Sequence, residues 1–456
     1  MTTDSSILHA KLKEFFGFDS FKADQERIIR HLTSGKNAFV LMPTGGGKSL
    51  CYQLPALVME GTAIVVSPLI ALMKNQVDAI RGFVSGNDGI AHFLNSSLNK
   101  AQITEVRNDL LSGATKLLYV APESLTKAEN VAMLKEIKIS FYAIDEAHCI
   151  SQWGQDFRPS YLRIVNFIDN LPYRPVVGAY TATATSQVQK DIEKILKLNH
   201  PVRTVTGFDR PNLFFDVIHP ELKDRELKRL LAERKGKSGI VYCSTRKKVE
   251  TVCENLQTLG YQATRYHAGL EESERKKNQE DFLYDRKNIM VATNAFGMGI
   301  DKSNVSFVIH YNMPKSIEAY YQEAGRAGRD GAEADCILLY NSGDINTARF
   351  LIQNGSDNED LDPIQREMIQ KQDLARLESM VTYCKTNACL RGYILEYFGQ
   401  KHPEVCGNCG TCKGIYTDVD ITRESQMILS CVQRIKDHLG HYVGKPTVVR
   451  TLQGSR

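Results

Sequence analysis

Short apolar runs alternate with amphipathic stretches along most of this chain, from about residue 36 to residue 340. The runs are four or five residues long and are bounded by polar or turn-forming residues, as is typical of strands buried in a parallel sheet. The stretches between them, such as residues 48–59 and 68–83, have the length and apolar spacing of helices. This alternation predicts an α/β protein built on parallel sheets.

The strand pattern restarts near Gly207, which predicts two successive α/β domains rather than one long sheet. The predicted strands lie at residues 38–42, 63–67, 116–120, 141–145 and 176–180, and then at 239–243, 263–266, 289–292, 307–311 and 336–340. After an acidic linker at 354–362, apolar residues recur every three or four positions on one helix face, at Leu374, Leu377, Val381 and Cys384. We expect domains at residues 1–206 and 207–345, a helical module at 346–415 and a short segment at 416–456.

Composition restricts the class of protein. The 456 residues are 42% hydrophobic and 24% charged, which is ordinary for a soluble chain, and no apolar run approaches the roughly 20 residues of a membrane span. The start of the chain has no secretory signal, so we expect a cytoplasmic protein with no membrane contact. A net charge of +4 neither requires nor excludes nucleic acid as a partner, because a nearly neutral chain can contain a basic groove.

A glycine-rich segment between a predicted strand and a predicted helix indicates a phosphate-binding loop. It reads Pro43-Thr44-Gly45-Gly46-Gly47-Lys48-Ser49. Glycines let backbone N–H groups turn toward phosphate oxygens, and the helix N-terminus favours an anion. We expect Lys48 to reach the β- and γ-phosphates and the Ser49 hydroxyl to ligate Mg²⁺. The strict pattern has glycine where this chain has Met42, and the alternative interpretation is a turn that binds nothing.

Two acidic residues, Asp145 and Glu146, follow a predicted strand about 100 residues after this loop. A carboxylate at a strand end can hold Mg²⁺, and its neighbour can orient or deprotonate the attacking water. Adjacent acids are usually a solvated strand edge, but this position in the same α/β domain favours catalysis. We predict that Asp145 ligates Mg²⁺ and that Glu146 acts on the water.

Two arginines three positions apart, Arg326 and Arg329, lie in the second predicted α/β domain within the segment Gln-Glu-Ala-Gly-Arg-Ala-Gly-Arg. Small residues around them permit close approach to another surface. Such arginines can neutralise transition-state charge on a γ-phosphate bound in the neighbouring domain. A solvated basic patch is the alternative interpretation.

Five of the eleven cysteines crowd into one short stretch, which in a cytosolic chain favours a metal over disulfides. Cys389, Cys406, Cys409 and Cys412 supply four thiolates, the ligand set of a closed zinc site or of an Fe–S cluster. Cys389 begins a predicted helix at 389–398, whose dipole is expected to favour its thiolate. Cys384 lies on an apolar stripe, and we interpret it as a core residue.

In this order the motifs resemble superfamily 2 helicases and, with the segments between them, the RecQ family of DNA helicases. The resemblance covers essentially the whole chain from about residue 8. Its family-like segments include residues 16–25, 67–76, 145–148, 181–185, 242–246, 267–269 and 292–301 besides the motifs above. It implies two tandem RecA-like domains, a helical zinc-binding module and the start of a winged helix.

The resemblance implies an ATP-dependent DNA helicase that moves 3′ to 5′ on single-stranded DNA, unwinds duplex DNA and acts in recombination and repair. It implies ATP, Mg²⁺ and Zn²⁺ as cofactors, and forked or tailed duplex DNA and single-strand-binding protein as partners. A monomer in the bacterial cytoplasm, associated with the nucleoid, is expected. The alternatives are an RNA helicase and a DNA-structure-binding scaffold with a degenerate ATP site.

The resemblance also assigns roles to single residues. Adenine recognition falls on Phe18, Lys22 and Gln25, although the family usually has arginine at the position of Lys22. Asp301 belongs to the nucleotide site. Coupling of DNA to ATP hydrolysis falls on a loop and on the motif before it, at His148, Trp153, Phe157 and Arg158. Thr181 and Thr183 are expected to link the sheet to the DNA groove, and Gln155 stands where many relatives have histidine.

The last segment contains a predicted amphipathic helix, Thr422–Leu439, which resembles the first helix of the family's winged-helix domain. We expect the rest of such a domain, including its wing hairpin, to be absent from these residues. We therefore expect DNA-dependent ATPase activity with weaker duplex binding than a chain that includes the whole domain.

Overall fold

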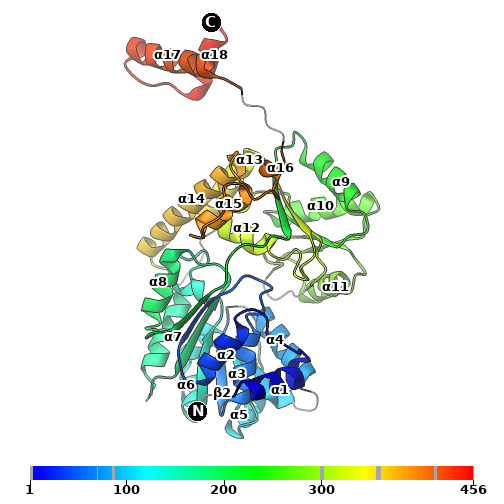
Figure 1. The fold of residues 1–456 in the computed structure, drawn as a ribbon, viewed down its shortest axis with the longest axis vertical. Helices are drawn as coiled ribbons and strands as arrows, with labels where there is room; N and C mark the ends of the chain where they lie inside the picture. Colours follow the sequence, from blue (N-terminus) through cyan, green and yellow to red (C-terminus); the bar gives the residue numbers. More distant parts are fainter. Residues whose placement is uncertain are drawn as a thin grey trace. The chain divides into compact units, whose positions relative to one another are not determined.

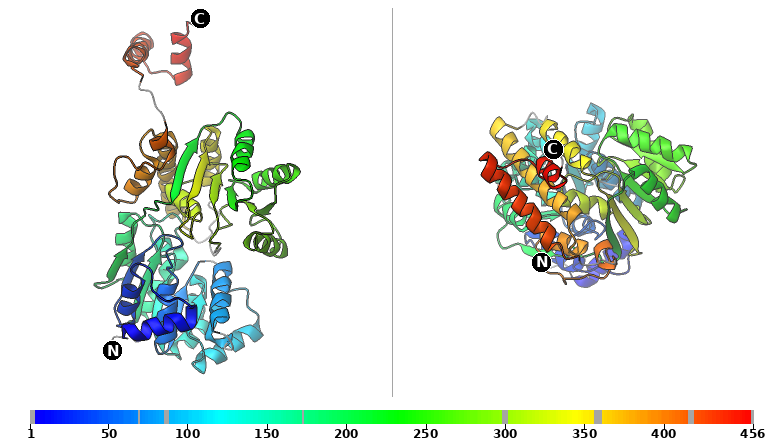
Figure 2. Two further views of the ribbon diagram at one scale, coloured as in Figure 1. Left: turned by 45° about the vertical axis from the view of Figure 1, so that its right-hand side comes forward. Right: turned by 90° about the horizontal axis from the view of Figure 1, so that it is seen from above.

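The structure is a computed structural model that describes residues 4–68, 70–84, 88–171, 173–297, 302–355, 361–414 and 419–454. The chain divides into two compact units, residues 1–412 and 413–456. The first unit contains two parallel sheets with helices on both faces of each, as Figures 1 and 2 show. The predicted fold class is therefore confirmed.

The first sheet has seven parallel strands in the order β3-β4-β2-β5-β6-β1-β7. Their bounds are β1 Ala38–Leu41, β2 Thr62–Val66, β3 Ala91–Leu94, β4 Leu117–Val120, β5 Ile139–Ile144, β6 Val176–Thr181 and β7 Val202–Val205. Strands β1 and β5 both pair with β6, so the segments that follow them meet at one edge of the sheet. This order brings the glycine-rich loop and Asp145 together.

Alternate side chains along a strand pack into two separate apolar cores, one on each face of the sheet, as expected for a sheet that is covered on both faces. Phe39 and Leu41 of β1 join one apolar cluster, whereas Ala38 and Val40 join the other. The covering α-helices are α1 Ser5–Phe16, α2 Gln25–Thr33, α3 Leu50–Val58, α4 Ile70–Phe83, α5 Lys100–Leu111, α6 Ala128–Lys135, α7 Pro159–Asp169 and α8 Ser186–Ile195.

The second sheet has six parallel strands in the order β10-β11-β9-β12-β13-β8. Their bounds are β8 Leu213–Ile218, β9 Gly239–Tyr242, β10 Ala263–Tyr266, β11 Ile289–Ala292, β12 Phe307–His310 and β13 Ala334–Leu339. The helices of this domain are α9 Lys223–Glu233, α10 Arg246–Thr258, α11 Glu272–Leu283, α12 Ile317–Ala324 and α13 Gly343–Asn354.

A helical module follows and packs on the second domain through α12, α13 and β8 (Figure 1). Its helices are α14 Pro363–Lys385, α15 Leu390–Tyr397 and the short α16 Gly410–Lys413. Asp362 and Gln365 form a reciprocal capping box at the start of α14, which satisfies backbone N–H groups there. Leu377 and Cys384 are buried on the stripe that the sequence predicted for this helix.

The second unit consists of α17 Thr422–Leu439 and α18 Lys445–Leu452, which pack on each other. The bounds of α17 agree with the predicted helix, and α18 was not predicted. All residues of α17 are described, and none of them is buried. In the described part of the chain, no helix combines the length and the apolar character that a bilayer span needs.

All ten predicted strands are present, with ends that shift by at most two residues. Three strands were missed, namely β3, β7 and β8. Strand β7 lies at the sheet edge and only its Thr204 is buried, so it has no continuous apolar run. Strand β3 contains His92, whose burial is compensated by a 2.8 Å contact with Asp109.

Candidate active site

The glycine-rich loop joins β1 to α3 in a backbone conformation that only glycine adopts easily. Gly45 and Gly47 have φ of 85° and 79°. A methyl group on Gly46 would lie 2.6 Å from Cγ of Met42. Met42, which stands where the strict pattern has glycine, therefore packs directly against the loop. The loop thus keeps the form of a phosphate cradle without the first glycine of the strict pattern.

Of the residues assigned to adenine recognition, Gln25 contacts this loop and also binds Lys22. Gln25 is buried; its Nε2 donates to the carbonyl oxygen of Gly47 at 3.1 Å, and its Oε1 accepts from the N–H of Lys22 at 2.8 Å. Gln25 therefore ties the adenine motif to the phosphate loop. The Phe18 ring is 50% exposed, so it is not a core aromatic and is accessible for stacking. Asp301 lies outside the described residues.

Asp145 and Glu146 are buried directly after β5. Burial and the neighbouring Glu146 carboxylate raise the pKa of Asp145 to about 7, while Lys48 acts in the opposite direction. Glu146 has φ of 47° and ψ of 46°, the left-handed region, which costs free energy in a residue with a side chain. Two buried acids that face a lysine suit a divalent cation bound to phosphate.

Polar contacts run from Glu146 to the next strand and to the second domain. His148 Nδ1 lies 3.3 Å from Glu146 Oε2 and 2.9 Å from Thr181 Oγ1. Gln155 Nε2 donates to Thr183 Oγ1 at 3.2 Å and to Gln322 Oε1 at 3.3 Å. Burial lowers the pKa of His148, which favours the neutral ring.

Of the two arginines of the second domain, Arg329 reaches the first domain, and Arg326 lies within its own. A methyl group on Gly45 would lie 3.2 Å from Cγ of Arg329, so this side chain lies against the phosphate loop. Arg326 is buried, and a methyl group on Gly297 would lie 2.6 Å from its Nη2. The Nε–H of Arg326 is buried and donates to no acceptor among the described atoms. Such an unsatisfied donor suits a site that takes an anionic ligand.

The loop at 151–159, here named the aromatic loop, is held on two sides. Ser151 Oγ donates to Asp191 Oδ2 of α8 at 2.7 Å. Arg376 of α14 donates to the carbonyl oxygens of Trp153 at 2.8 Å and of Gly154 at 3.0 Å. Neither Asp191 nor Arg376 was predicted, because no local pattern marks an acid that accepts from a hydroxyl 40 residues away or an arginine that binds a distant backbone carbonyl.

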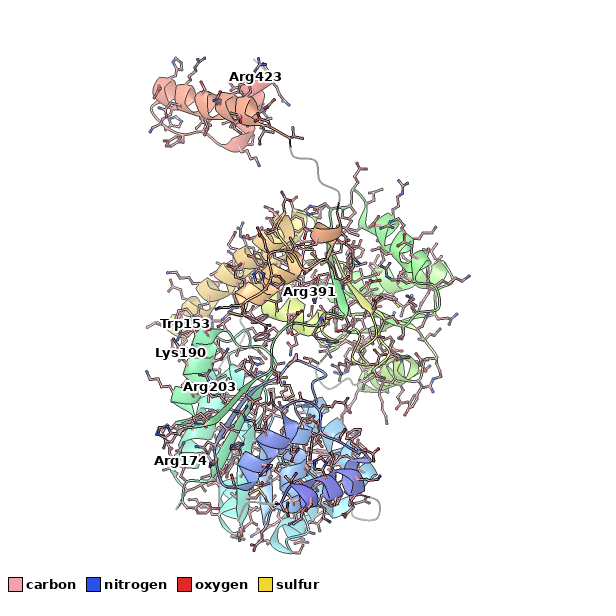
Figure 3. The ribbon with its side chains drawn as sticks, in the orientation of Figure 1. Trp153, Arg174, Lys190, Arg203, Arg391 and Arg423 are labelled. Atoms are coloured by element: carbon pink, nitrogen blue, oxygen red, sulfur yellow. The ribbon has the colours of Figure 1, made fainter. Side chains whose placement is uncertain are left out.

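Side chains of the aromatic loop differ in their exposure. The Trp153 ring is 49% exposed and lies at the edge of the first domain (Figure 3), so it is not a core anchor. Phe157 is buried, and Arg158 donates to Asp156 and to the carbonyl oxygen of Pro68. Of the predicted DNA-coupling residues, Trp153 alone presents a large accessible ring.

A cleft of about 570 Å³ separates the two domains beside this loop. Its walls include His148 and Arg158 from the first domain, Arg326 from the second and Arg376 from the helical module. The cleft therefore brings three sequence-distant parts of the chain to one place.

The predicted cysteine cluster is assembled in the helical module. The sulfur atoms of Cys389, Cys406, Cys409 and Cys412 all lie within 4.8 Å of one another. The Cys389–Cys409 and Cys406–Cys412 distances are both 3.9 Å. Zn–S bonds of about 2.3 Å in a tetrahedron require sulfur separations of about 3.8 Å, so the four thiols fit zinc. Cys384 is buried elsewhere in the core, as predicted.

The local environment of the four thiols differs. Cys389 caps α15 and its sulfur accepts from the Gly392 N–H at 3.3 Å, but burial still raises the pKa of Cys389 to about 12. The expected effect of the helix dipole is therefore outweighed. Burial opposes the Cys409 thiolate as well, yet hydrogen bonds from Thr411 and backbone N–H groups lower its pKa to about 6.

Comparisons with known proteins agree with these sites. Residues 22–192 match the DEAD/DEAH box helicase family, residues 222–331 the helicase conserved C-terminal domain, and residues 342–413 the RecQ zinc-binding family. The ATP-dependent DNA helicase RecQ of Bacillus subtilis is 47% identical over 447 residues, which cover 98% of this chain and 73% of that protein. The chain belongs to the RecQ family. It is thus an ATP-hydrolysing DNA helicase, with ATP, Mg²⁺ and Zn²⁺ as cofactors.

Other RecQ relatives and solved structures are similar over most of the chain. The RecQ helicase of Pasteurella multocida is 41% identical over 443 residues, 97% of this chain and 67% of that protein. The structure of S. cerevisiae Dbp5 bound to RNA and ADP BeF3 has a TM-score of 0.60 and 19% identity, over 80% of this chain and 97% of that chain. The structure of the helicase MrfA bound to DNA and AMPPNP has a TM-score of 0.62 and 20% identity, and the match covers 88% of this chain and 59% of that chain. These two structures support the fold alone.

Proposed function

We propose that this RecQ-family chain moves 3′ to 5′ along single-stranded DNA and unwinds duplex DNA in recombination and repair, with ATP hydrolysed at a site shared by its two RecA-like domains. The observation that carries this proposal is the position of Arg329 against Gly45. An arginine of one domain contacts the phosphate loop of the other. Hydrolysis of the bound nucleotide can therefore change the position of one domain relative to the other.

Each residue of the nucleotide site has a role that suits its position. Lys48 and the loop from Thr44 to Ser49 bind the phosphates, and Ser49 and Asp145 would hold Mg²⁺, which neutralises phosphate charge when bound. Glu146 orients and deprotonates the attacking water, which agrees with its burial beside His148. Arg326 and Arg329 stabilise the charge that develops on the γ-phosphate.

Phe18, Lys22 and Gln25 recognise adenine in this proposal, with the exposed Phe18 ring stacked on the base. Asp301 is assigned to the same nucleotide site on the family resemblance alone. The aromatic loop senses DNA because the exposed Trp153 ring offers a stacking surface for bases. Phe157 and Arg158 support the loop from within. His148 couples the position of the aromatic loop to Glu146 through a 3.3 Å contact.

Further partners belong to the proposal. We infer that the chain acts as a monomer on forked or tailed DNA in the bacterial cytoplasm, at the nucleoid, with single-strand-binding protein as a partner. The bacterial sources of the relatives from Bacillus and Pasteurella support the bacterial setting of this proposal.

Strand displacement tests the direction of movement. The substrates are one duplex with a 3′ single-stranded tail, the same duplex with a 5′ tail and a blunt duplex, at one fixed salt concentration because phosphate contacts are salt-dependent. We expect ATP-dependent displacement of the 3′-tailed substrate only. Preference for the 5′ tail, or displacement without ATP, would contradict the proposal.

A further inference from the structure

The segment that joins the two RecA-like domains, residues 207–213, is bound by the zinc-binding module. Phe208 stacks on Phe398 at the end of α15, with ring centroids 4.3 Å apart and planes only 9° apart. The Phe208 N–H donates to Oε1 of Gln400, and its carbonyl oxygen accepts from the Tyr321 hydroxyl at 2.8 Å. The zinc-binding module and α12 therefore hold the path of the linker together.

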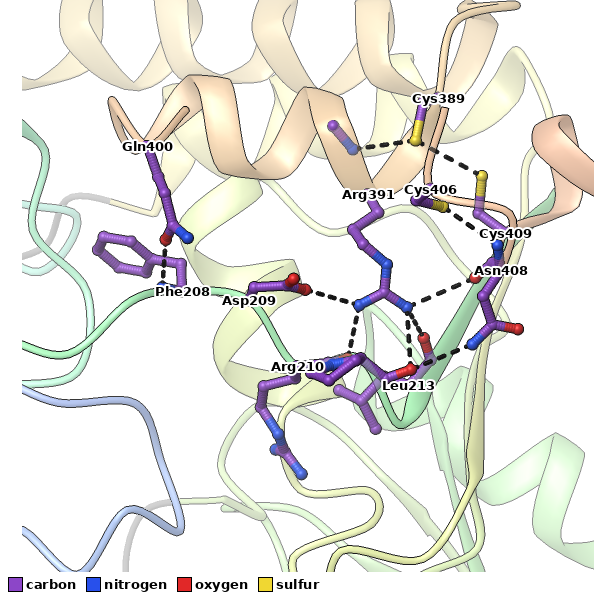
Figure 4. Close-up of polar contacts among 12 residues, drawn as sticks. Phe208, Asp209, Arg210, Leu213, Cys389, Arg391, Gln400, Cys406, Asn408 and Cys409 are labelled. Atoms are coloured by element: carbon purple, nitrogen blue, oxygen red, sulfur yellow. Dashed lines mark hydrogen bonds and ion pairs between the residues drawn. The ribbon is translucent and has the colours of Figure 1, made fainter. Parts of the chain in front are cut away.

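Arg391 connects this linker to the cysteine cluster. It is buried in the first turn of α15, two residues after Cys389. Its guanidinium donates to Asp209 at 2.8 Å, to the carbonyl oxygen of Arg210 at 2.6 Å and to that of Leu213. Figure 4 shows the same group reaching toward Asn408, in the loop that carries two zinc-ligating cysteines.

The side chain of Arg210 extends from the linker to the segment 325–329, here named the arginine loop because it carries Arg326 and Arg329. Arg210 donates to three carbonyl oxygens of that loop, those of Gly325 at 2.6 Å, Ala327 at 2.8 Å and Gly328 at 2.7 Å. The guanidinium of arginine carries N–H donors on three nitrogens in one plane, so it can bind several separated acceptors at once. The ammonium of lysine carries all its donors on one nitrogen and cannot span the same acceptors.

Two features show that this contact shapes the loop. The bonded carbonyls lie at and just after the C-terminus of α12, where backbone carbonyls lack helical partners and a cation is favourable. Asn212 supplements the fork by donating to the carbonyl oxygens of Gly328 at 3.0 Å and Ala332 at 2.8 Å. Loss of Arg210 would leave three carbonyls of the arginine loop without this donor.

We propose that Arg210 is a positioning residue for ATP hydrolysis, which holds the arginine loop so that Arg329 faces the phosphate loop, and that Arg391 holds Arg210 in turn. The zinc-binding module then sets the geometry of the ATP site through the linker, without touching nucleotide. The inference rests on the proposed roles of Arg326 and Arg329.

The test compares Arg210→Ala and Arg210→Lys with wild type in the full chain. We expect turnover to fall roughly 10- to 100-fold in both variants, as for a misplaced catalytic group. Affinity for ADP with aluminium fluoride, which resembles the transition state, should fall at least about tenfold, while affinity for ADP alone stays within about twofold. Arg391→Lys should give the same selective loss with its zinc content unchanged. Full turnover in Arg210→Lys, or equal loss of both affinities, would overturn the proposal.

The matched control is Arg234→Ala. Arg234 is also a largely buried arginine of the second domain, but its guanidinium pairs with Asp335 at 2.8 Å and donates to the carbonyl oxygen of Leu230 at 2.8 Å, not to the carbonyls of the arginine loop. Its loss should lower thermal stability and leave turnover of the folded protein unchanged. A fall in turnover equal to that of Arg210→Ala would show a general effect of destabilisation and overturn the inference.

A double variant separates this inference from the proposed function. If Arg210 acts through Arg329, then Arg210→Ala with Arg329→Ala should be no slower than Arg329→Ala alone, within about twofold. Multiplied losses would overturn the role of Arg210 and leave that of Arg329 intact. Wild-type turnover in Arg329→Ala would instead overturn the proposed function of the arginine itself.

Discussion

Arg376 Nη2 lies 2.8 Å from the carbonyl oxygen of Trp153, so a helix of the zinc-binding module holds the aromatic loop of the first RecA-like domain. The contact leaves the Trp153 ring exposed. It joins two segments that are 223 residues apart in sequence. A loop whose backbone is held in place while its tryptophan ring stays exposed is suited to sense the binding of bases.

Trp153→Ala should reduce ATP turnover stimulated by single-stranded DNA by roughly tenfold, since stacking of one base contributes about 1–3 kcal/mol. Basal turnover should change little, because the ring contributes little to the core. The control is Tyr173→Ala, which removes a ring of nearly equal exposure, 48%, from the same domain. Equal losses of basal and stimulated turnover would mean that Trp153 serves packing and not DNA sensing.

Arg376→Ala should release the aromatic loop and lower DNA-stimulated turnover several-fold, with basal turnover and zinc content unchanged. The physical reason is the loss of both hydrogen bonds to the Trp153 and Gly154 carbonyl oxygens. Arg349→Ala is a suitable control, because Arg349 of α13 pairs with Glu378 of α14 at the exposed surface. Unaltered DNA stimulation in Arg376→Ala would show that this contact does not position the loop.

Glu146→Gln should bind nucleotide like wild type and turn it over roughly 10²- to 10⁴-fold more slowly, the range for loss of a general base. The amide preserves the shape of the side chain but cannot accept the proton of water. Glu60→Gln is the control, because Glu60 forms a surface ion pair with Lys138 at 2.7 Å. Fluorescent-nucleotide binding and phosphate release measure the two quantities, and wild-type turnover in Glu146→Gln would remove Glu146 from the mechanism.

Cys409→Ser should lose zinc and make residues 364 to 415 sensitive to protease, because metal binding contributes to the folding free energy of such a module. Cys384→Ser replaces a thiol in the same module that lies outside the cluster, so it should keep one zinc per chain. Elemental analysis and limited proteolysis provide the readouts. Iron in the wild-type protein, or zinc retained at full occupancy in Cys409→Ser, would refute the assignment.

The sequence predicted the buried strands well because a strand covered on both faces has a continuous apolar run. Strands β10 and β11 have the predicted ends, Ala263–Tyr266 and Ile289–Ala292. Strand β7 was missed because it lies at an edge with alternating exposure. The missed helix α18 begins Lys-Pro-Thr, with proline in its first turn, and only its Val448 is buried, so its apolar pattern is weak.

The local motifs placed Lys48, Asp145 and the four cysteines where their chemistry requires them to meet. The contacts between modules were not predictable. Arg210, Arg376 and Arg391 each bind backbone carbonyl oxygens more than 100 positions away in the chain. A carbonyl oxygen is present in every residue, so the sequence carries no signal for which one an arginine will bind.

ATP turnover by the wild-type chain, measured alone, with single-stranded DNA and with RNA of the same sequence, tests the central claim most directly. The account predicts low basal turnover, strong stimulation by DNA and much weaker stimulation by RNA. Turnover that no nucleic acid changes, or that RNA stimulates as strongly as DNA, would contradict a DNA-driven motor.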